Sequence, residues 1–215
     1  MSVNFYNNNA EQLAEMYLSK PFEEIHVSWL EYLVPVLNKP NARILDLGAG
    51  AGRDSKYMAE QGAENNISVT AIEPAQMLAE LGEQQTQGLN VNWLQDTLPD
   101  LQHVTQQEIS FDLILLSAVW MHIPNAQRAR SLRKLASLIK PGGQLVITLR
   151  HGPKSMYHYS DQPSREQRHM FAVCSDQLLH LAKDLGLTPL LVTDKNTDVL
   201  GRSDILWQTV VLKRN

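Results

Sequence analysis

From residue 43 onward, short apolar runs alternate with segments of helical spacing, and no other feature of the sequence constrains the fold as strongly. The apolar runs lie at 43–47, 67–72, 89–94, 111–116 and 145–149, and the helical patterns lie at 53–61, 75–85 and 125–139. Strands joined by helices pair in parallel through right-handed crossovers, so the alternation predicts a doubly wound α/β sheet. Two later runs, 187–192 and 205–212, have only a short polar link and are expected to pair antiparallel.

The chain before the first strand, residues 1–40, is expected to form a helical cover. One face of its clearest helix is marked by apolar residues at steps of three or four, at Phe22, Ile25, Trp29, Leu33 and Val36. Proline is tolerated in a first helical turn, so the helix is expected to begin at Pro21. With 215 residues and no repeat or linker, the chain is expected to form a single domain, 1–215.

The first strand ends in Asp46-Leu47-Gly48-Ala49-Gly50-Ala51-Gly52, a turn with three alternate glycines. Glycine lets backbone approach a ligand where a Cβ would collide, and open α/β sheets bind ligands at the carboxyl ends of their strands. An NTP-binding loop needs Lys and then Ser or Thr after its last glycine, but Arg53 and Asp54 follow here. The turn therefore predicts a nucleotide-like ligand other than an NTP, with tight packing of the turn as the alternative.

The charge of Asp46 helps to choose between cofactors. A dinucleotide places its pyrophosphate over the helix that follows the turn, where a carboxylate disfavours it. S-adenosylmethionine (SAM) carries an ammonium group and no phosphate, so Asp46 favours SAM over NAD, which remains the alternative.

Two further acids follow the second and third strands. Glu73, before Pro74, ends the second strand about 20 residues beyond the turn, a spacing at which an acid accepts hydrogen bonds from ribose hydroxyls. NAD enzymes use the same device, so Glu73 predicts an adenosine ligand without choosing a cofactor. Asp96 is expected to accept the adenine amino group, with Leu98 covering the ring; a loop or cap role for Asp96 is the alternative.

These segments together resemble the class I SAM-dependent methyltransferases. The resemblance spans roughly residues 40 to 150 and is carried by ILDLGAGAGR, VTAIEP, LQDTLP, FDLILLSAVWMHIP and LRKLASLIKPGGQLVITLR, whose KPGG turn is characteristic of the small-molecule branch. It implies a Rossmann-like seven-stranded sheet in the order 3-2-1-4-5-7-6, with strand 7 antiparallel. The cofactor-binding residues it implies are Tyr6, Asp46, Gly48, Ala49, Gly50, Arg53, Glu73, Pro74, Asp96, Thr97, Leu98 and Ser117.

The segment after the fourth strand bears on the methyl acceptor. DNA and RNA amino-methyltransferases carry an Asn/Asp-Pro-Pro-Tyr/Phe block there, whereas this chain has Ser117-Ala118-Val119-Trp120. A small-molecule acceptor with an O or N atom is therefore expected, methylated by in-line displacement. His122 is the candidate general base and Trp120 a candidate wall of the acceptor site; a loop histidine and a core tryptophan are the alternatives.

The segment 150–173 lacks clear periodicity and follows the fifth strand at the ligand edge. Long loops of this kind are often lids or binding elements, so the segment is a candidate substrate lid. Arg150, His151 and Arg168 are its candidate acceptor-binding residues, because arginine can grip a carboxylate or phosphate bidentately. A solvated surface loop is the alternative.

Composition narrows the other possibilities. The net charge of −4 gives no general nucleic-acid footprint, and no apolar run approaches the length that spans a bilayer. A single cysteine, Cys174, and a polar N-terminus predict a cytoplasmic protein. The histidines have no metal-like spacing with cysteines or acids, so no metal site is expected. A non-catalytic SAM-binding protein and an NAD-dependent oxidoreductase remain as alternative functions.

Overall fold

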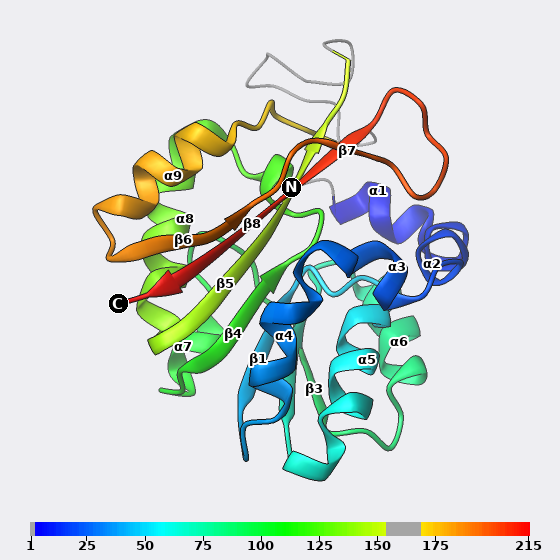
Figure 1. The fold of residues 1–215 in the computed structure, drawn as a ribbon. Helices are drawn as coiled ribbons and strands as arrows, with labels where there is room; N and C mark the ends of the chain where they lie inside the picture. Colours follow the sequence, from blue (N-terminus) through cyan, green and yellow to red (C-terminus); the bar gives the residue numbers. More distant parts are fainter. Residues whose placement is uncertain (1–2, 154–168) are drawn as a thin grey trace.

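The computed structural model describes residues 3–153 and 169–215, which form a twisted sheet with helices on both faces (Figure 1). The strands are β1 (Arg43–Leu47), β2 (Ser68–Ile72), β3 (Val91–Leu94), β4 (Phe111–Leu116), β5 (Ile139–His151), β6 (Leu187–Val192), β7 (Asn196–Thr197) and β8 (Leu206–Arg214). Their order is β3-β2-β1-β4-β5-β8-β6, with the short β7 paired to β8. This order confirms the predicted 3-2-1-4-5-7-6 sheet, because β8 takes the place of the predicted seventh strand.

Pairing directions also follow the prediction. β1 pairs in parallel with β2 and β4, and β8 runs antiparallel to both β5 and β6. All six residues of β4 are buried, as a strand covered on both faces requires. The strand β5 begins at Ile139, earlier than the predicted start at residue 145, because its pairing with β4 already starts at Phe111 opposite Ile139.

Side chains along the central strands alternate between two apolar clusters, one on each face of the sheet. Leu45 and Leu47 belong to the first cluster, whereas Ile44, the residue before Leu45 in β1, belongs to the second. The first cluster packs under α8 (Asn125–Leu138) and α9 (Ser175–Lys183). The second packs under α4 (Leu30–Leu37) and α5 (Arg53–Gln61), and this two-residue alternation fixes which side chains stay at the strand tips.

The N-terminal cover is helical but more broken than predicted. It comprises α1 (Val3–Asn8), α2 (Ala10–Leu18), α3 (Phe22–His26), the 3-10 turn η1 (Val27–Trp29) and α4. The single helix expected from Pro21 breaks at η1, where the side chains of His26 and Trp29 are fully buried and hydrogen-bonded to each other. Four described elements have no counterpart among the predictions: η2 (Ala63–Asn65), α7 (Gln102–Gln106), η3 (Trp120–His122) and β7.

Gly82 lies inside α6 (Gln76–Gln85), although glycine disfavours helix. A Cβ at this position would lie 2.1 Å from Cη2 of Trp93 on β3, so the helix approaches the sheet only because residue 82 has no side chain. We expect Gly82→Ala to lower the free energy of unfolding by about 1–3 kcal/mol, the usual cost of overpacking. Denaturant unfolding measures this, with the exposed Glu83→Ala of the same helix as the control. Equal stability of the two variants would contradict the packing account.

Candidate active site

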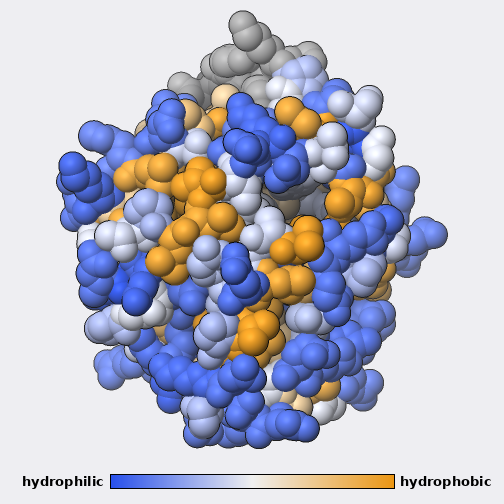
Figure 2. Space-filling view, viewed as in Figure 1, coloured by the Kyte–Doolittle hydropathy of each residue, from blue (hydrophilic) through white to orange (hydrophobic). Residues whose placement is uncertain are grey.

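One cavity of about 330 Å³ opens at the carboxyl ends of β1, β2 and β4 and extends beneath the N-terminal cover. Most of the predicted site residues line it: Tyr6, Gly48, Ala49, Gly50, Arg53, Glu73, Pro74, Asp96, Thr97, Leu98, Ser117, His122 and Arg150. The outer surface of the face in Figure 2 is mixed, with groups of hydrophobic residues between hydrophilic ones. The cavity therefore brings together residues that lie more than 140 positions apart.

The glycine turn combines tight packing with an open wall. Gly48, Gly50 and Gly52 all have positive φ, between 57° and 85°. A Cβ on Gly48 would lie 2.3 Å from Cγ2 of Val119, so packing alone requires glycine there. At Gly50 the nearest neighbour of such a Cβ is the ring of Tyr17 at 3.7 Å, which leaves room beside the backbone.

Glu73 lies at the tip of β2 with its carboxylate turned back to the glycine turn. Its two oxygens accept hydrogen bonds from the backbone N–H of Gly50 at 3.0 Å and of Ala75 at 2.8 Å. The side chain is buried, with 7% exposure, and burial raises its pKa to about 7, against the lowering effect of the two hydrogen bonds. Each oxygen keeps a lone pair, so the ionised group can accept further hydrogen bonds from a ligand in the cavity.

Asp46 lies beneath the turn, and the cavity wall is made by its neighbours from Leu47 to Ala51. Its carboxylate is 1% exposed and accepts a hydrogen bond from Oγ of Ser55 at 2.6 Å. Burial, reinforced by the nearby charge of Asp54, raises the pKa of Asp46 to about 7. The predicted direct contact of Asp46 with an ammonium group stays a prediction, and the observed contact supports the turn from inside.

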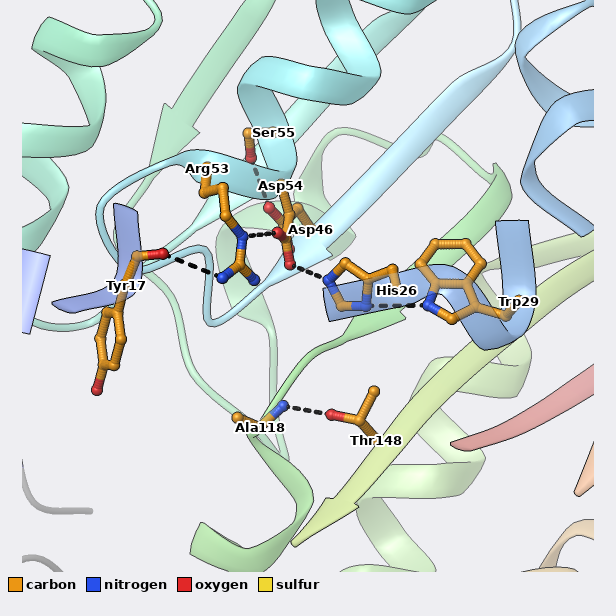
Figure 3. A network of polar contacts seen from close by, with 9 residues as sticks. All are labelled: Tyr17, His26, Trp29, Asp46, Arg53, Asp54, Ser55, Ala118 and Thr148. Carbon is orange, nitrogen blue, oxygen red and sulfur yellow. Dashed lines mark hydrogen bonds and ion pairs between the residues drawn. The ribbon is translucent and has the colours of Figure 1, made fainter. Parts of the chain in front are cut away.

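A buried polar chain links the cover to the turn (Figure 3). Trp29 Nε1 donates to Nδ1 of His26 at 3.0 Å, and Nε2 of His26 lies 2.9 Å from Oδ2 of Asp54. Arg53 donates from Nε to Asp54 at 2.7 Å and from Nη1 to the carbonyl oxygen of Tyr17 at 3.1 Å. Burial raises the pKa of Asp54, but His26 and Arg53 outweigh it and hold that pKa well below its usual value.

Sequence patterns did not single out this chain of contacts. In the sequence, His26 is one residue of an expected helix, and Asp54 only argues against an NTP-binding loop. The available signal is the charged pair Arg53-Asp54 in the first turn of a helix. The partner of Asp54, His26, lies 28 positions away.

Asp96 is held by backbone donors. One oxygen accepts from the N–H of Thr97 and Gln102, at 2.8 and 3.1 Å, and the other from the N–H of Val104 at 3.1 Å. These bonds satisfy the start of α7, which matches the alternative cap role. Asp96 also lines the cavity beside Thr97 and Leu98, and its contact with an adenine amino group stays a prediction.

Tyr6 and His122 line the cavity and contact each other. Tyr6 Oη lies 3.0 Å from Nε2 of His122, and Nδ1 of His122 lies 2.7 Å from the carbonyl oxygen of His169. Beside them, Oγ1 of Thr148 accepts from the N–H of Ala118 at 2.8 Å and positions the loop after β4 (Figure 3). His122 thus lies at the cavity, as the base hypothesis requires.

Two of the predicted acceptor-binding residues lie elsewhere. Trp120 is 1% exposed and packs in the core with the guanidinium of Arg128 5.9 Å over its ring, so its prediction as a cavity wall is wrong. The 3-10 turn η3 points Trp120 inward and His122 outward. His151 is outside the cavity lining and lies 3.3 Å from the side-chain oxygen of Gln208 on β8, because strand alternation turns it away from the side of Arg150.

Arg150 and the segment after it are only partly described. Arg150 is buried, lines the cavity, and donates from Nη1 to Sδ of Met170 at 3.0 Å. Arg168 and most of the candidate lid 150–173 lie outside the described residues. Their role in binding an acceptor stays a prediction.

The cavity has a further wall that the sequence interpretation missed, the link between β6 and β8 (residues 193–205). Asp198 in this link accepts hydrogen bonds from Nε and Nη2 of Arg202, at 2.9 and 2.6 Å, and from Nε1 of Trp207 at 2.7 Å. Burial raises the pKa of Asp198, but these donors outweigh it and lower the pKa to about 2. All three residues line the cavity, and β7 anchors the link to β8. The predicted short polar connection is therefore a structured part of the site.

Among the described residues, no group of three or more His, Cys, Asp or Glu side chains is arranged to hold a metal ion. A search of the same residues for a helix long and apolar enough to cross a bilayer found none.

Comparison with known proteins supports the predicted class. The family model described as a methyltransferase domain matches residues 44–143. The ubiquinone biosynthesis O-methyltransferase of Xanthomonas axonopodis pv. citri is 34% identical over 131 residues, and that of Coxiella burnetii is 29% identical over the same length. Each alignment covers 60% of this chain but 52% of the relative, so the chain spans about half the length of the curated relatives it matches.

Solved structures show the same fold over nearly the whole chain. Magnesium protoporphyrin IX methyltransferase from Synechocystis has a TM-score of 0.68 at 14% identity, covering 99% of this chain and 97% of that one. The 1,6-didemethyltoxoflavin-N1-methyltransferase of Burkholderia thailandensis has a TM-score of 0.65 at 19% identity, covering 99% and 87%. In sequence over residues 44–143 and in fold over nearly the whole chain, the protein is thus similar to methyltransferases, as the sequence predicts.

Proposed function

We propose that the protein binds SAM in this cavity and transfers the methyl group to an oxygen or nitrogen atom of a small molecule. One observation carries the proposal: a single cavity is lined by the glycine turn and the buried Glu73 and also by Tyr6, His122 and Arg150. Cofactor and acceptor can therefore meet inside one cavity. Methyl transfer needs this arrangement, because much of its acceleration comes from alignment of the reacting atoms.

The residues of the cofactor end fit SAM better than a dinucleotide. The backbone beside Gly50 is open, and the lone pairs of Glu73 suit the two hydroxyls of a ribose. A pyrophosphate over the same turn would meet the carboxylates of Glu73 and, beneath it, Asp46. Thr97, Leu98 and Pro74 would flank the adenine, and Ser117 and Tyr6 the methionine part. When bound, SAM supplies an electrophilic methyl group and its sulfur keeps the electrons of the broken bond.

The names of the relatives support an oxygen or nitrogen acceptor. The ubiquinone biosynthesis enzymes are O-methyltransferases, and the toxoflavin enzyme is an N1-methyltransferase crystallised with S-adenosylhomocysteine (SAH) and its acceptor. In this chain the acceptor would lie between His122, Arg150 and the link 193–205.

Isothermal titration calorimetry with SAM, SAH and NADH tests the cofactor. The proposal is supported if SAM and SAH bind and NADH does not. Tight NADH binding with no SAM binding favours an NAD-dependent oxidoreductase. Radiolabelled SAM is then incubated with the protein and a small-molecule extract. Bound SAM with no labelled product across the extract and a broad acceptor panel would indicate a non-catalytic SAM-binding protein.

The link 193–205 gives a prediction about acceptor binding. Asp198→Asn removes the charge that orients Arg202 and the indole of Trp207, so we expect the KM for the acceptor identified by labelling to rise about tenfold or more, the value of a charge-assisted hydrogen bond. The SAH dissociation constant is expected to stay within about twofold, because the link contains none of the residues proposed to contact the cofactor. Asp194→Asn, an exposed change in the same link, is the control. A KM equal to that of the control would contradict the assignment.

A further inference from the structure

The partners of His122 define which of its ring nitrogens is basic. Nδ1 lies 2.7 Å from the carbonyl oxygen of His169, and a carbonyl oxygen only accepts hydrogen bonds. We therefore assign the hydrogen of the neutral ring to Nδ1. Nε2 then carries the lone pair, and the hydroxyl of Tyr6, 3.0 Å away, is the donor to it.

The positions of the His122 and Tyr6 rings are each fixed by the helical element that carries them. His122 lies in η3, whose turn is closed by its N–H bond to the carbonyl oxygen of Val119 at 2.8 Å. Tyr6 lies in α1, and its neighbour Asn7 accepts from the N–H of Met77 in α6 at 3.0 Å, which ties α1 to the domain. The two rings meet edge to face, with centroids 5.8 Å apart and planes at 89°. The basic nitrogen thus faces the tyrosine oxygen, while Tyr6 itself lines the cavity.

We propose that Tyr6 and His122 act as a proton-accepting pair for an acceptor that still carries its proton at neutral pH, a phenol or other hydroxyl or an N–H group, rather than a carboxylate. The proposal rests on the proposed methyl transfer and deepens it. A carboxylate is already ionised at neutral pH and needs no base, whereas a phenol with a pKa of about 10 does. The pair therefore indicates the chemical class of the substrate.

The proton balance follows from the geometry. As the acceptor oxygen forms its bond to the methyl carbon, its own proton moves to the Tyr6 oxygen, and the Tyr6 proton moves to Nε2 of His122. Tyrosine ends neutral, the imidazole becomes an imidazolium that still donates from Nδ1 to His169, and the extra proton later leaves to water. The carbonyl of His169 stabilises the charged ring, since it accepts from N–H in both states. Other charged groups of the cavity are Arg150 and the Asp198–Arg202 pair at the acceptor end, and Glu24, Arg53, Asp54, Glu73 and Asp96 toward the cofactor end.

The test compares Tyr6→Phe and His122→Gln with the wild type at about pH 8.5 on two phenol probes. Catechol is largely protonated at this pH. 4-Nitrophenol is a more acidic phenol and is largely ionised. We expect each variant to lower kcat for catechol by about 100-fold, the usual contribution of a general base, and the double variant to add little. On 4-nitrophenol the loss is expected to be within about threefold, because no proton has to be removed. Tyr32→Phe, which removes a hydroxyl outside the cavity, is the matched control.

A measurement without turnover separates this proposal from the proposed function. Ring ¹⁵N NMR of the full chain is expected to show His122 with hydrogen on Nδ1, and Tyr6→Phe to shift its Nε2 resonance while Tyr32→Phe does not. The pair would be overturned by hydrogen on Nε2 of His122, or by an equal loss of kcat on both probes. If wild type methylates neither probe and binds no SAM, the proposed function fails instead, and the NMR result still decides the tautomer.

Discussion

Replacing Glu73 with Gln is expected to weaken SAH binding by about 10- to 100-fold, the range for hydrogen bonds to a charged group. The carboxylate accepts from Gly50 and Ala75 and offers its remaining lone pairs to the ribose. An amide accepts through one atom only, so one backbone donor and one ribose hydroxyl lose their partner. Calorimetry measures the loss, and Glu80→Gln, an exposed change on α6, is the control.

The same residue gives the binding a pH dependence. Burial raises the pKa of Glu73 to about 7, so the ligand-binding ionised form is a minority below that pH. We expect SAH to bind more tightly as the pH rises from about 6 to 8 in the wild type, and this dependence to disappear in Glu73→Gln. A pH-independent dissociation constant in the wild type would rule out Glu73 as the ribose acceptor.

The stability of the ligand-free protein should change in the opposite sense. Since the folded pKa is about 7 and the ordinary value is 4.5, the folded chain holds a proton that the unfolded chain has released between these pH values. The free energy of unfolding should therefore fall as pH rises across this window, by roughly 3 kcal/mol, and level off above it. Asp46 shifts in the same direction, whereas the lowered pKa of Asp54 acts only below about pH 4. Urea unfolding at both ends of the window measures the change.

Replacing Asp54 with Ala is expected to lower the free energy of unfolding by about 3–5 kcal/mol, the cost of removing one partner of a buried ion pair. The carboxylate is 5% exposed and bridges His26 and Arg53, at 2.9 and 2.7 Å. Its loss leaves the Nε2 hydrogen of the fully buried His26 without an acceptor and frees Arg53 from its position at the cavity. Denaturant unfolding should show the loss, and SAH binding should weaken with it.

The matched control is Glu60→Ala in the same helix. Glu60 forms an exposed ion pair with Lys56 at 3.8 Å, and exposed pairs contribute at most about 1 kcal/mol. A second variant, His26→Gln, preserves a donor to Asp54 and is expected to cost less than Asp54→Ala. Similar stability of Asp54→Ala and Glu60→Ala would show that the buried chain of contacts does not hold the cover to the domain.

Local sequence patterns predicted the elements of the central sheet closely. β1, β4 and α5 have the bounds expected from their apolar and helical periods, because period and glycine punctuation depend only on nearby residues. The glycine turn, Glu73 and His122 line one cavity, since the carboxyl ends of parallel strands share one edge of the sheet, and their roles stay predictions. Trp120 was misplaced because a three-residue turn, η3, decides which of two adjacent side chains faces the core.

By itself, the sequence determined the strand order and the edge of the sheet where the cavity lies, because these follow from periodicity and from the glycine turn. It also supplied the acids on which the SAM proposal rests. Only the tertiary structure decided that Asp46 accepts from Ser55 beneath the turn and that His26 reaches Asp54. It also decided that Tyr6 meets His122 across 116 positions and that Asp198 holds Trp207 at the cavity. These contacts join segments with no shared local pattern. Their geometry depends on how the cover and the β6–β8 link pack on the sheet, which no single stretch of sequence specifies.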